Sequence, residues 1–186
     1  MRVVHSTEIP GLPFAAKGKV AIIQGDRDIL GLPLDPGELE TWLRVEPHRV
    51  VGLVVEGDLT ARFSITSFAP QGPFLWVRGS LKAPDIALSD APMRVDGELS
   101  VRGLTGPVEV MGNLRCELLV AQPHPVIVHG ALAARVVLGV VETDRSLAVV
   151  GWWDQLSKLH PSLITEGQLD HRALLTAMDK GEPLLA

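Results

Sequence analysis

A chain of 186 residues, of which 46% are hydrophobic and 21% charged, is long enough for one domain with a sizeable core, and it lacks the composition of a disordered protein. The formal net charge of −5 argues against a dedicated nucleic-acid-binding protein, which usually carries a strong basic excess. The single cysteine, Cys116, excludes an intramolecular disulfide and argues against a cysteine-based zinc site.

Residues 1–47 are predicted to form an N-terminal capping segment. Its first 14 residues lack the continuous apolar run of a secretory signal, so a bacterial-type cytoplasmic protein is expected. Lys19 to Gln24 has the pattern of a strand. Asp35 is predicted to cap a short helix, because a proline and a glutamate follow at the first and third helical positions. The apolar face of that helix would contain Leu39, Trp42 and Leu43.

Residues 48–153 contain a motif that recurs six times, an apolar residue and a valine before a glycine and a leucine or tryptophan after it. The copies are LVVEGDL, LWVRGSL, MRVDGEL, VEVMGNL, VIVHGAL and LAVVGWW, and their glycines are Gly57, Gly79, Gly97, Gly112, Gly130 and Gly151. Apolar residues alternate with polar or mixed ones in each copy, which is typical of strands with one buried face. Each glycine is expected at a corner that needs close backbone approach or positive φ.

The motif predicts a mainly β fold, a right-handed parallel β-helix of about six rungs with short helical caps at both ends. Its interior would hold one ladder of valines and one of leucines. An antiparallel sandwich of short strands is the alternative, but it does not account for a fixed glycine in each copy. The unequal glycine spacings lack the strict six-residue period of a left-handed β-helix.

Residues 154–186 are predicted to form a C-terminal helical cap. A short helix is expected from Asp154 to His160, ended by Pro161. A second helix is expected from Thr165 or Glu166 to Lys180, with Gly181 as its C-cap. Packed over the last rung, the two helices would close the stack and protect its edge. No stretch reaches the length of a membrane-spanning helix.

The column three residues before each glycine should point outward, yet most of its members are apolar: Val54, Trp76, Arg94, Glu109, Ile127 and Ala148. Trp76 and Ile127 are therefore candidate partner-binding residues. The alternative, which the sequence leaves open, is that the N-terminal segment or the C-terminal helix covers this column.

A second candidate surface is a partly basic stripe on a protein that is acidic overall. It lies three and five residues after the glycines and includes Arg62, Lys82, Arg102, Arg115 and Arg135. The functional interpretation is a docking face for an acidic partner. The alternative is a solvated sheet face that limits aggregation, and Glu117 interrupts the stripe.

The sequence contains no convincing catalytic constellation. It has no nucleophile elbow, P-loop or GxGxxG motif, and its closest histidine pair, His124 and His129, lacks the spacing of a metal site. Asp58 and Glu98 share a column but are separated by one rung, which is wide for paired catalytic carboxylates. No catalytic residue, metal, cofactor or small-molecule substrate is therefore predicted.

The segments VEGDLTARFSI, VDGELSVRGL, VMGNLRCELLV and VHGALAARVVL resemble the repeats of bactofilin-like, polymer-forming cytoskeletal proteins over residues 50–153. The resemblance implies a right-handed β-helix without cofactor or catalytic residues. Bactofilins stack end to end into filaments, whereas the helices expected at both ends of this chain would block such stacking.

Three functions are compatible with these features. The first is a non-enzymatic, protein-binding module, such as an immunity or antitoxin-type protein that occludes a toxin. The second is a bactofilin-like scaffold that self-assembles. The third, less favoured, is a β-helix enzyme acting on carbohydrate or acyl groups.

Overall fold

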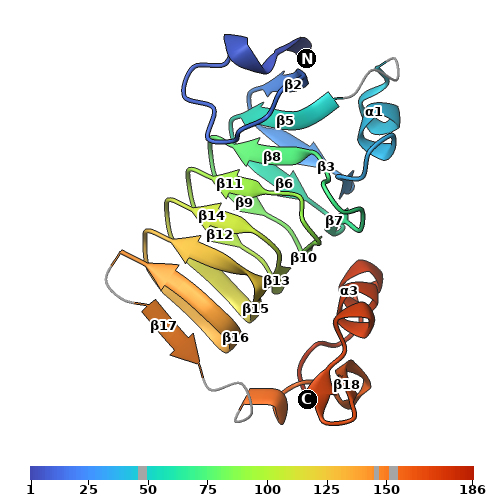
Figure 1. Ribbon diagram of the computed structural model, residues 1–186, viewed down its shortest axis with the longest axis vertical. Helices are drawn as coiled ribbons and strands as arrows, with labels where there is room; N and C mark the ends of the chain where they lie inside the picture. The colour runs from blue at the N-terminus through green and yellow to red at the C-terminus, as the bar shows by residue number, and fades with distance from the viewer. Residues whose placement is uncertain (46–49, 145–146, 151–154) are drawn as a thin grey trace.

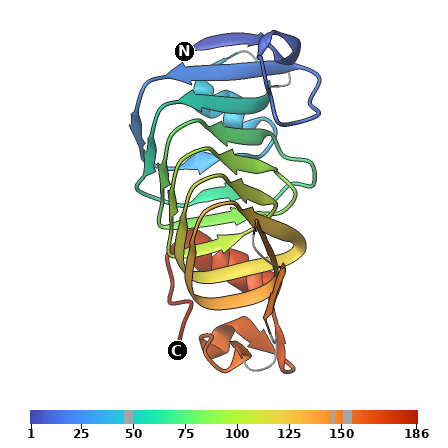
Figure 2. The same cartoon turned by 90° about the vertical axis from the view of Figure 1, so that its left-hand side faces the viewer.

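The chain folds into a β-solenoid of about five turns with few helices (Figure 1). The computed structural model describes residues 1–45, 50–144, 147–150 and 155–186. Each turn contributes strands to parallel sheets, so successive turns lie one above another (Figure 2). This arrangement confirms the parallel β-helix predicted from the repeat, and it places equivalent residues of neighbouring turns about 4.8 Å apart.

Three sheets run along the stack. The first contains β2 (Lys19–Gln24), β5 (Val50–Glu56), β8 (Phe74–Val77), β11 (Met93–Val95), β14 (Val108–Val110) and the last parts of β15 (Leu114–Val128) and β16 (Leu132–Thr143). The second contains β3 (Arg27–Ile29), β6 (Leu59–Ala61), β9 (Leu81–Lys82), β12 (Leu99–Ser100) and the first parts of β15 and β16. The third contains β4 (Leu32–Pro33), β7 (Ile65–Ser67), β10 (Asp85–Leu88), β13 (Gly103–Thr105) and the middle parts of β15 and β16.

Ladders of apolar residues fill the interior, as predicted. The valine ladder of the first sheet is buried along its length: Val55, Val77, Val95, Val110 and Val128. The leucine ladder of the second sheet is buried from Leu59 to Leu114. Burying one such side chain contributes roughly 1.5–3 kcal/mol, so the ladders are the main source of the fold's stability.

A glycine occupies the corner between the first and second sheets in successive turns. The amide of Gly97 donates to the carbonyl oxygen of Gly79 at 2.9 Å, and the amide of Gly112 donates to that of Gly97 at 3.1 Å. A Cβ atom on Gly97 would lie 2.7 Å from the carbonyl carbon of Gly79, and one on Gly112 would lie 2.4 Å from the carbonyl oxygen of Gly97. Close backbone approach therefore requires glycine here.

The strand pairing begins earlier than residue 48. β2, β3 and β4 already pair in parallel with β5, β6 and β7, so part of the segment 1–47 is a turn of the solenoid. Before it, β1 (Arg2–His5) pairs antiparallel with β2 and leads into the 3-10 turn Ser6–Glu8. β1 thus covers the free edge of the first sheet at the N-terminal end of the stack.

The helix α1 (Glu38–Leu43) follows β4, but Asp35 does not cap it. Gly37 is the N-cap, and Oδ1 of Asp35 instead accepts hydrogen bonds from the amides of Phe68, at 2.8 Å, and Ala69, at 2.7 Å. The predicted cap is therefore wrong, because the carboxylate of Asp35 binds backbone amides at a corner of the next turn. Leu39 and Leu43 are buried in the core, which confirms the predicted apolar face.

The sixth motif copy does not add a parallel rung. β17 (Leu147–Val150) pairs antiparallel with β16, and Ala148 lies opposite Val141 instead of continuing the column from Ile127. Residues Val141–Thr143 of β16 instead pair in parallel with Val126–Val128 of β15 and continue the first sheet. Gly151 and Trp153, also assigned to this copy, lie outside the described residues.

In the C-terminal segment Gln155 and Leu156 are helical, within the first predicted helix, but the start of the second helix differs from the prediction. Ile164–Thr165 (β18) and Gln168–Leu169 (β19) form a hairpin, with φ of 53° at Glu166 and 77° at Gly167. The helix α3 (His171–Lys180) therefore begins later than predicted, after the N-cap Asp170. The 3-10 turn Pro161–Leu163 precedes the hairpin, and Asp154, the predicted start of the first helix, lies outside the described residues.

The helix α3 does not lie over the last rung, as the cap prediction required. It packs beside the stack, against β10 of the third sheet (Figure 1). The predicted C-cap is confirmed, since Gly181 adopts a left-handed conformation with φ of 70°. Within the described part of the chain, no helix is long and apolar enough to cross a membrane.

Candidate protein-binding surface

The outward side of the solenoid differs sharply among the three sheets. In the third sheet the outward residues Asp85, Gly103, Leu118 and Val136 are all buried. In the first sheet the column is buried at Val54 and Trp76 and half-buried from Arg94 to Ile127. In the second sheet it is exposed throughout: Asp28, Thr60, Lys82, Ser100, Arg115 and Ala133.

The N-terminal segment covers the upper part of the first sheet. Trp76 is only 5% exposed and belongs to a small core with Val54 and Phe74, against which Phe14 packs at 4.6 Å between ring centroids. The indole Nε1 of Trp76 donates to Oδ2 of Asp96 at 2.9 Å. At Trp76 the N-terminal segment therefore covers the column, and the side chain of Trp76 is not free for contact with a partner.

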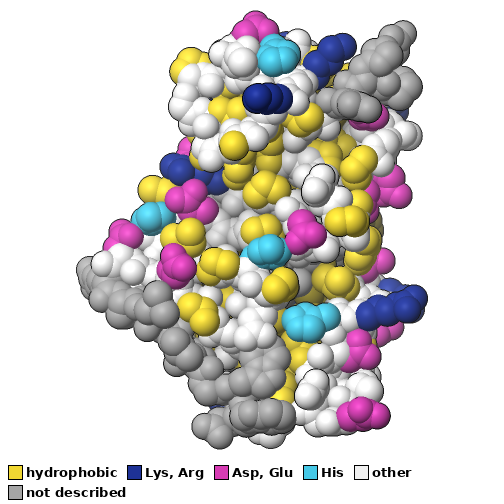
Figure 3. Space-filling view, in the orientation of Figure 1, with side chains coloured by type: hydrophobic (Ala, Val, Ile, Leu, Met, Phe, Trp, Pro, Cys, Tyr) yellow, Lys and Arg dark blue, Asp and Glu magenta, His cyan; other side chains and the backbone are white. Residues whose placement is uncertain are grey.

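Lower on the first sheet the outward residues form an ionic network. Arg94 pairs with Asp96 at 2.8 Å and with Glu109 at 3.1 Å. Ile127 lies half-buried in the same column, one strand beyond Glu109. On the face drawn in Figure 3, hydrophobic side chains are interspersed with acidic and histidine side chains.

His129 extends this network across the corner. Its ring lies 3.2 Å from a carboxylate oxygen of Glu109, through Nε2, and 2.8 Å from one of Asp144, through Nδ1. Partial burial lowers the pKa of His129, but the two carboxylates outweigh that effect, so the pKa lies above its usual value. His129 thus joins β14 to the chain beyond β16.

The C-terminal segment covers the third sheet. A second core forms where Leu174, Ala177 and Met178 of α3 join the outward residues Leu118 and Val136. Arg102 reinforces this contact, since its guanidinium pairs with the fully buried Asp85 and also donates to the carbonyl oxygens of Gly181, at 3.2 Å, and Glu182, at 2.9 Å. Arg102, predicted as a partner contact, is therefore engaged within the chain.

The second sheet is hollowed along the stack axis. Three adjoining depressions of about 360, 240 and 510 Å³ follow one another from β6 to the end of β16. Neighbouring depressions share Ser100, and then Asn113 and Ala131, so they form one shallow groove. Small outward residues make the floor, Lys82 and Arg115 rise from it, and the exposed Glu98, Glu117 and Asp144 also line it. We call this surface the second-sheet groove.

Lys82 and Arg115 have exposed side chains without an ion-pair partner among the residues that the structure describes. By contrast, the side chains of Asp58 and Ser80 at the glycine corner accept hydrogen bonds from the chain's own backbone. Oδ1 of Asp58 accepts from the amide of Ser80 at 2.7 Å, and the hydroxyl of Ser80 accepts from the amide of Glu98 at 3.2 Å. Asp58 and Glu98 thus form one column separated by Ser80, as the sequence indicated, and Asp58 and Ser80 tie neighbouring turns together.

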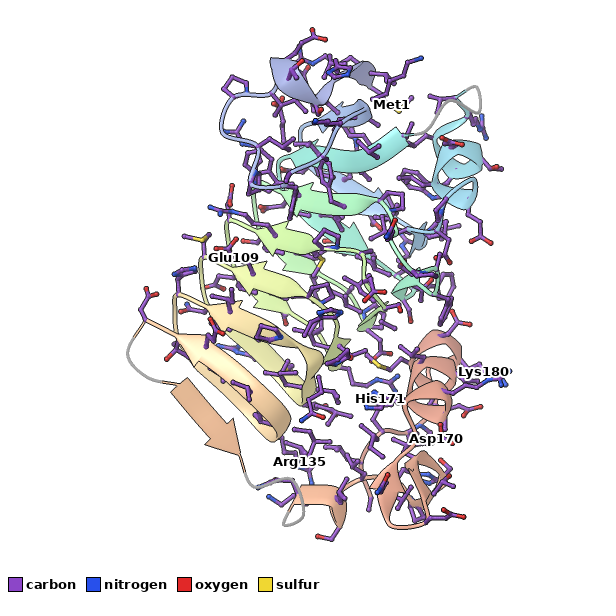
Figure 4. The ribbon with its side chains drawn as sticks, viewed as in Figure 1. Met1, Glu109, Arg135, Asp170, His171 and Lys180 are labelled. Atoms are coloured by element: carbon purple, nitrogen blue, oxygen red, sulfur yellow. The ribbon has the colours of Figure 1, made fainter. Side chains whose placement is uncertain are left out.

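The other predicted contact residues lie beside the groove. Arg62 forms an exposed ion pair with Asp28 at 3.1 Å. Arg135 is exposed near the C-terminal end of the stack (Figure 4). The structure therefore brings Lys82 and Arg115 together on one face, with Arg62, Arg102 and Arg135 along its edge, and leaves Trp76 and Ile127 on another sheet.

The sequence pattern did not indicate that Leu30 and Phe63, two of the exposed large apolar residues, lie side by side. Leu30 is 65% and Phe63 is 64% exposed, and they lie in neighbouring turns at the corner between the second and third sheets. The available signal was the long interval from Gly57 to Gly79, which leaves extra residues for this corner.

The described residues contain no group of three or more His, Cys, Asp or Glu side chains that could hold a metal ion. Cys116 is buried in the interior column, and burial raises the pKa of its thiol to about 12. Comparison of the chain with protein-family models gave no match, and comparisons with curated proteins and with solved structures gave none either.

Proposed function

We propose that this protein is a non-enzymatic binding module of the cytoplasm whose partner protein docks on the second-sheet groove. One observation carries the proposal: the chain covers the third sheet and the upper first sheet with its own terminal segments, while the outward residues of the second sheet are all exposed. A rigid, concave surface with fixed side-chain spacing suits recognition of one partner.

The partner is proposed to present carboxylates to Lys82 and Arg115. These two cations stand on the same outward column, two strands apart, which corresponds to about 10 Å. Glu98 and Glu117 line the same groove, so the unpaired basic pair favours carboxylates placed at Lys82 and Arg115 and gives no general attraction of polyanions. A toxin occluded by an immunity-type protein is one partner of this kind.

A bactofilin-like scaffold is the second candidate, supported by the repeat and a proposed right-handed winding of about six rungs. The strands β1 and β17 weigh against it, because each pairs antiparallel with the end of the first sheet. End-to-end stacking in parallel register would have to displace both strands. Light scattering and electron microscopy separate the candidates: filaments at micromolar concentration would overturn the capped-module proposal.

Charge reversal tests the groove. Protein tagged and expressed in its host is isolated with its partners, in the wild-type form and as Lys82→Glu/Arg115→Glu. The matched control is Arg172→Glu/Lys180→Glu on α3, since these residues are also one arginine and one lysine and both are exposed. Figure 4 labels Lys180. We expect a partner retained by the wild type and the control and lost by the groove variant. Equal retention by all three would show that another surface binds.

A further inference from the structure

We propose that Leu30 and Phe63 form the apolar anchor of the second-sheet groove, and that its occupant is an acidic polypeptide segment carrying an aromatic or aliphatic side chain. The inference deepens the proposed function and depends on it. A binding surface gains most of its affinity from a few apolar anchors, and charged contacts at its edge mainly add specificity.

The two anchor residues lie one above the other. The amide of Phe63 donates to the carbonyl oxygen of Leu30, which fixes the two residues at the same corner of neighbouring turns. Both side chains are about two-thirds exposed, although large apolar residues at this position gain nothing from contact with water. Gly31 has no side chain, and a Cβ atom there would lie 3.5 Å from that of Phe63, so the backbone of Gly31 lies close beside Phe63.

The anchor stands at the edge of the groove. Ala61, two residues before Phe63, lines the first depression together with Thr60 and Lys82, and Leu30 and Phe63 lie outside that lining. Below the anchor the same corner carries Pro84 and then Arg102, whose amide donates to the carbonyl oxygen of Pro84. An occupant that placed an apolar side chain on Leu30 and Phe63 would therefore reach the floor of the groove at Thr60 by extending about three residues further.

Charge and spacing favour an acidic segment over a second copy of this chain. An extended segment advances about 3.3 Å per residue, so carboxylates about three residues apart would meet Lys82 and Arg115. A two-fold symmetric dimer through this face would instead bring the unpaired Lys82 and Arg115 of the two copies toward each other.

Short glutamate-rich peptides provide the probe. Two peptides of equal length and charge differ only in carrying phenylalanine or alanine, and their affinities are measured by fluorescence anisotropy. Wild-type protein should bind the phenylalanine peptide about tenfold more tightly. The variant Leu30→Ala/Phe63→Ala should lose this preference, and the control Phe68→Ala, which removes another exposed aromatic ring at 48% exposure, should keep it.

The outcomes separate the anchor from the proposed function. If Lys82→Gln/Arg115→Gln weakens both peptides but Leu30→Ala/Phe63→Ala leaves the preference intact, the groove binds acidic segments and the anchor is wrong. If neither peptide binds the wild type, both proposals fail. A wild-type dimer that Phe63→Ala converts to a monomer would assign the anchor to a second copy. Unchanged melting temperatures confirm that the exposed substitutions leave the fold intact.

Discussion

Arg102 is paired with Asp85, whose side chain has no exposed surface, and the same guanidinium reaches the backbone of the C-terminal segment. Burial raises the pKa of Asp85, and the hydrogen bonds from Arg102 oppose that rise. Arg102 therefore holds the C-terminal segment against the third sheet, and it stabilises the carboxylate of Asp85, which lies buried beneath that segment.

Arg102→Ala should destabilise the protein by about 3 kcal/mol, because it leaves Asp85 without its cation. Denaturant unfolding measures the loss, and amide hydrogen exchange in α3 should accelerate. Arg62→Ala is the matched control, since its ion pair with Asp28 is exposed and should contribute little. Similar effects of the two substitutions would show that Arg102 does not hold the C-terminal segment.

Gly97→Ala should destabilise the fold by about 1–3 kcal/mol or more, since a Cβ atom would lie 2.7 Å from the backbone of Gly79. Ser100→Ala is the control on the same turn, because its side chain points outward into solvent, and it should change the free energy of unfolding by less than about 0.5 kcal/mol. Comparable stability of the two variants would mean that the glycine corner tolerates a side chain.

The interior of the solenoid could be predicted because its residues obey both alternation and stacking. Alternation within their own turn identifies Val77 and Leu81 as inward positions, and so do the equivalent residues of the neighbouring turn, Val95 and Leu99. The first turn was missed because Arg27 stands where later turns have leucine. It pairs with Leu59 on one side only, at the free end of the stack, so its side chain stays exposed.

Direction and docking could not be predicted. Alternation is the same in parallel and antiparallel strands, so the pattern of β17 did not show that it runs backward along β16. The apolar face of α3 indicated that this helix packs against the rest of the protein, but not which sheet it packs against. The outward Val120 and Leu138 are the signal for that site, because both belong to strands whose two faces are apolar.

Part of the groove could be predicted from the repeat, and part depends on contacts between distant segments. The outward positions of Lys82 and Arg115 follow from the column in which they occur. Whether a neighbouring residue such as Arg102 is free depends on contacts with Gly181 and Glu182, far along the chain. A column pattern contains no information on such contacts.

Cys116 should resist thiol reagents in the native protein. Burial raises the pKa of its thiol to about 12, so almost none is thiolate at neutral pH. We expect labelling by a chromogenic disulfide reagent to be at least about a hundredfold slower than in denaturant. Rapid, complete labelling under native conditions would place the thiol at the surface.

His129 should make stability depend on pH. Its pKa is raised in the folded protein, so its contribution is fully present below about pH 6.5, the unfolded value, and is lost as pH rises through the folded value. His129→Gln should flatten the dependence of the unfolding midpoint between pH 6 and 8, and an unaltered slope would refute this role.

Trp76 and Ile127 occupy one outward column but should differ in their effect on folding. Trp76 is 5% exposed beneath the N-terminal segment, whereas Ile127 is half-buried below it. Trp76→Ala should therefore cost about 3–5 kcal/mol, and Ile127→Ala about 1 kcal/mol. Denaturant unfolding measures both values, and amide exchange should show loosening around Phe14 only in the first variant. Equal costs would mean that the N-terminal segment does not seal the upper first sheet, and would return Trp76 to the set of candidate partner contacts.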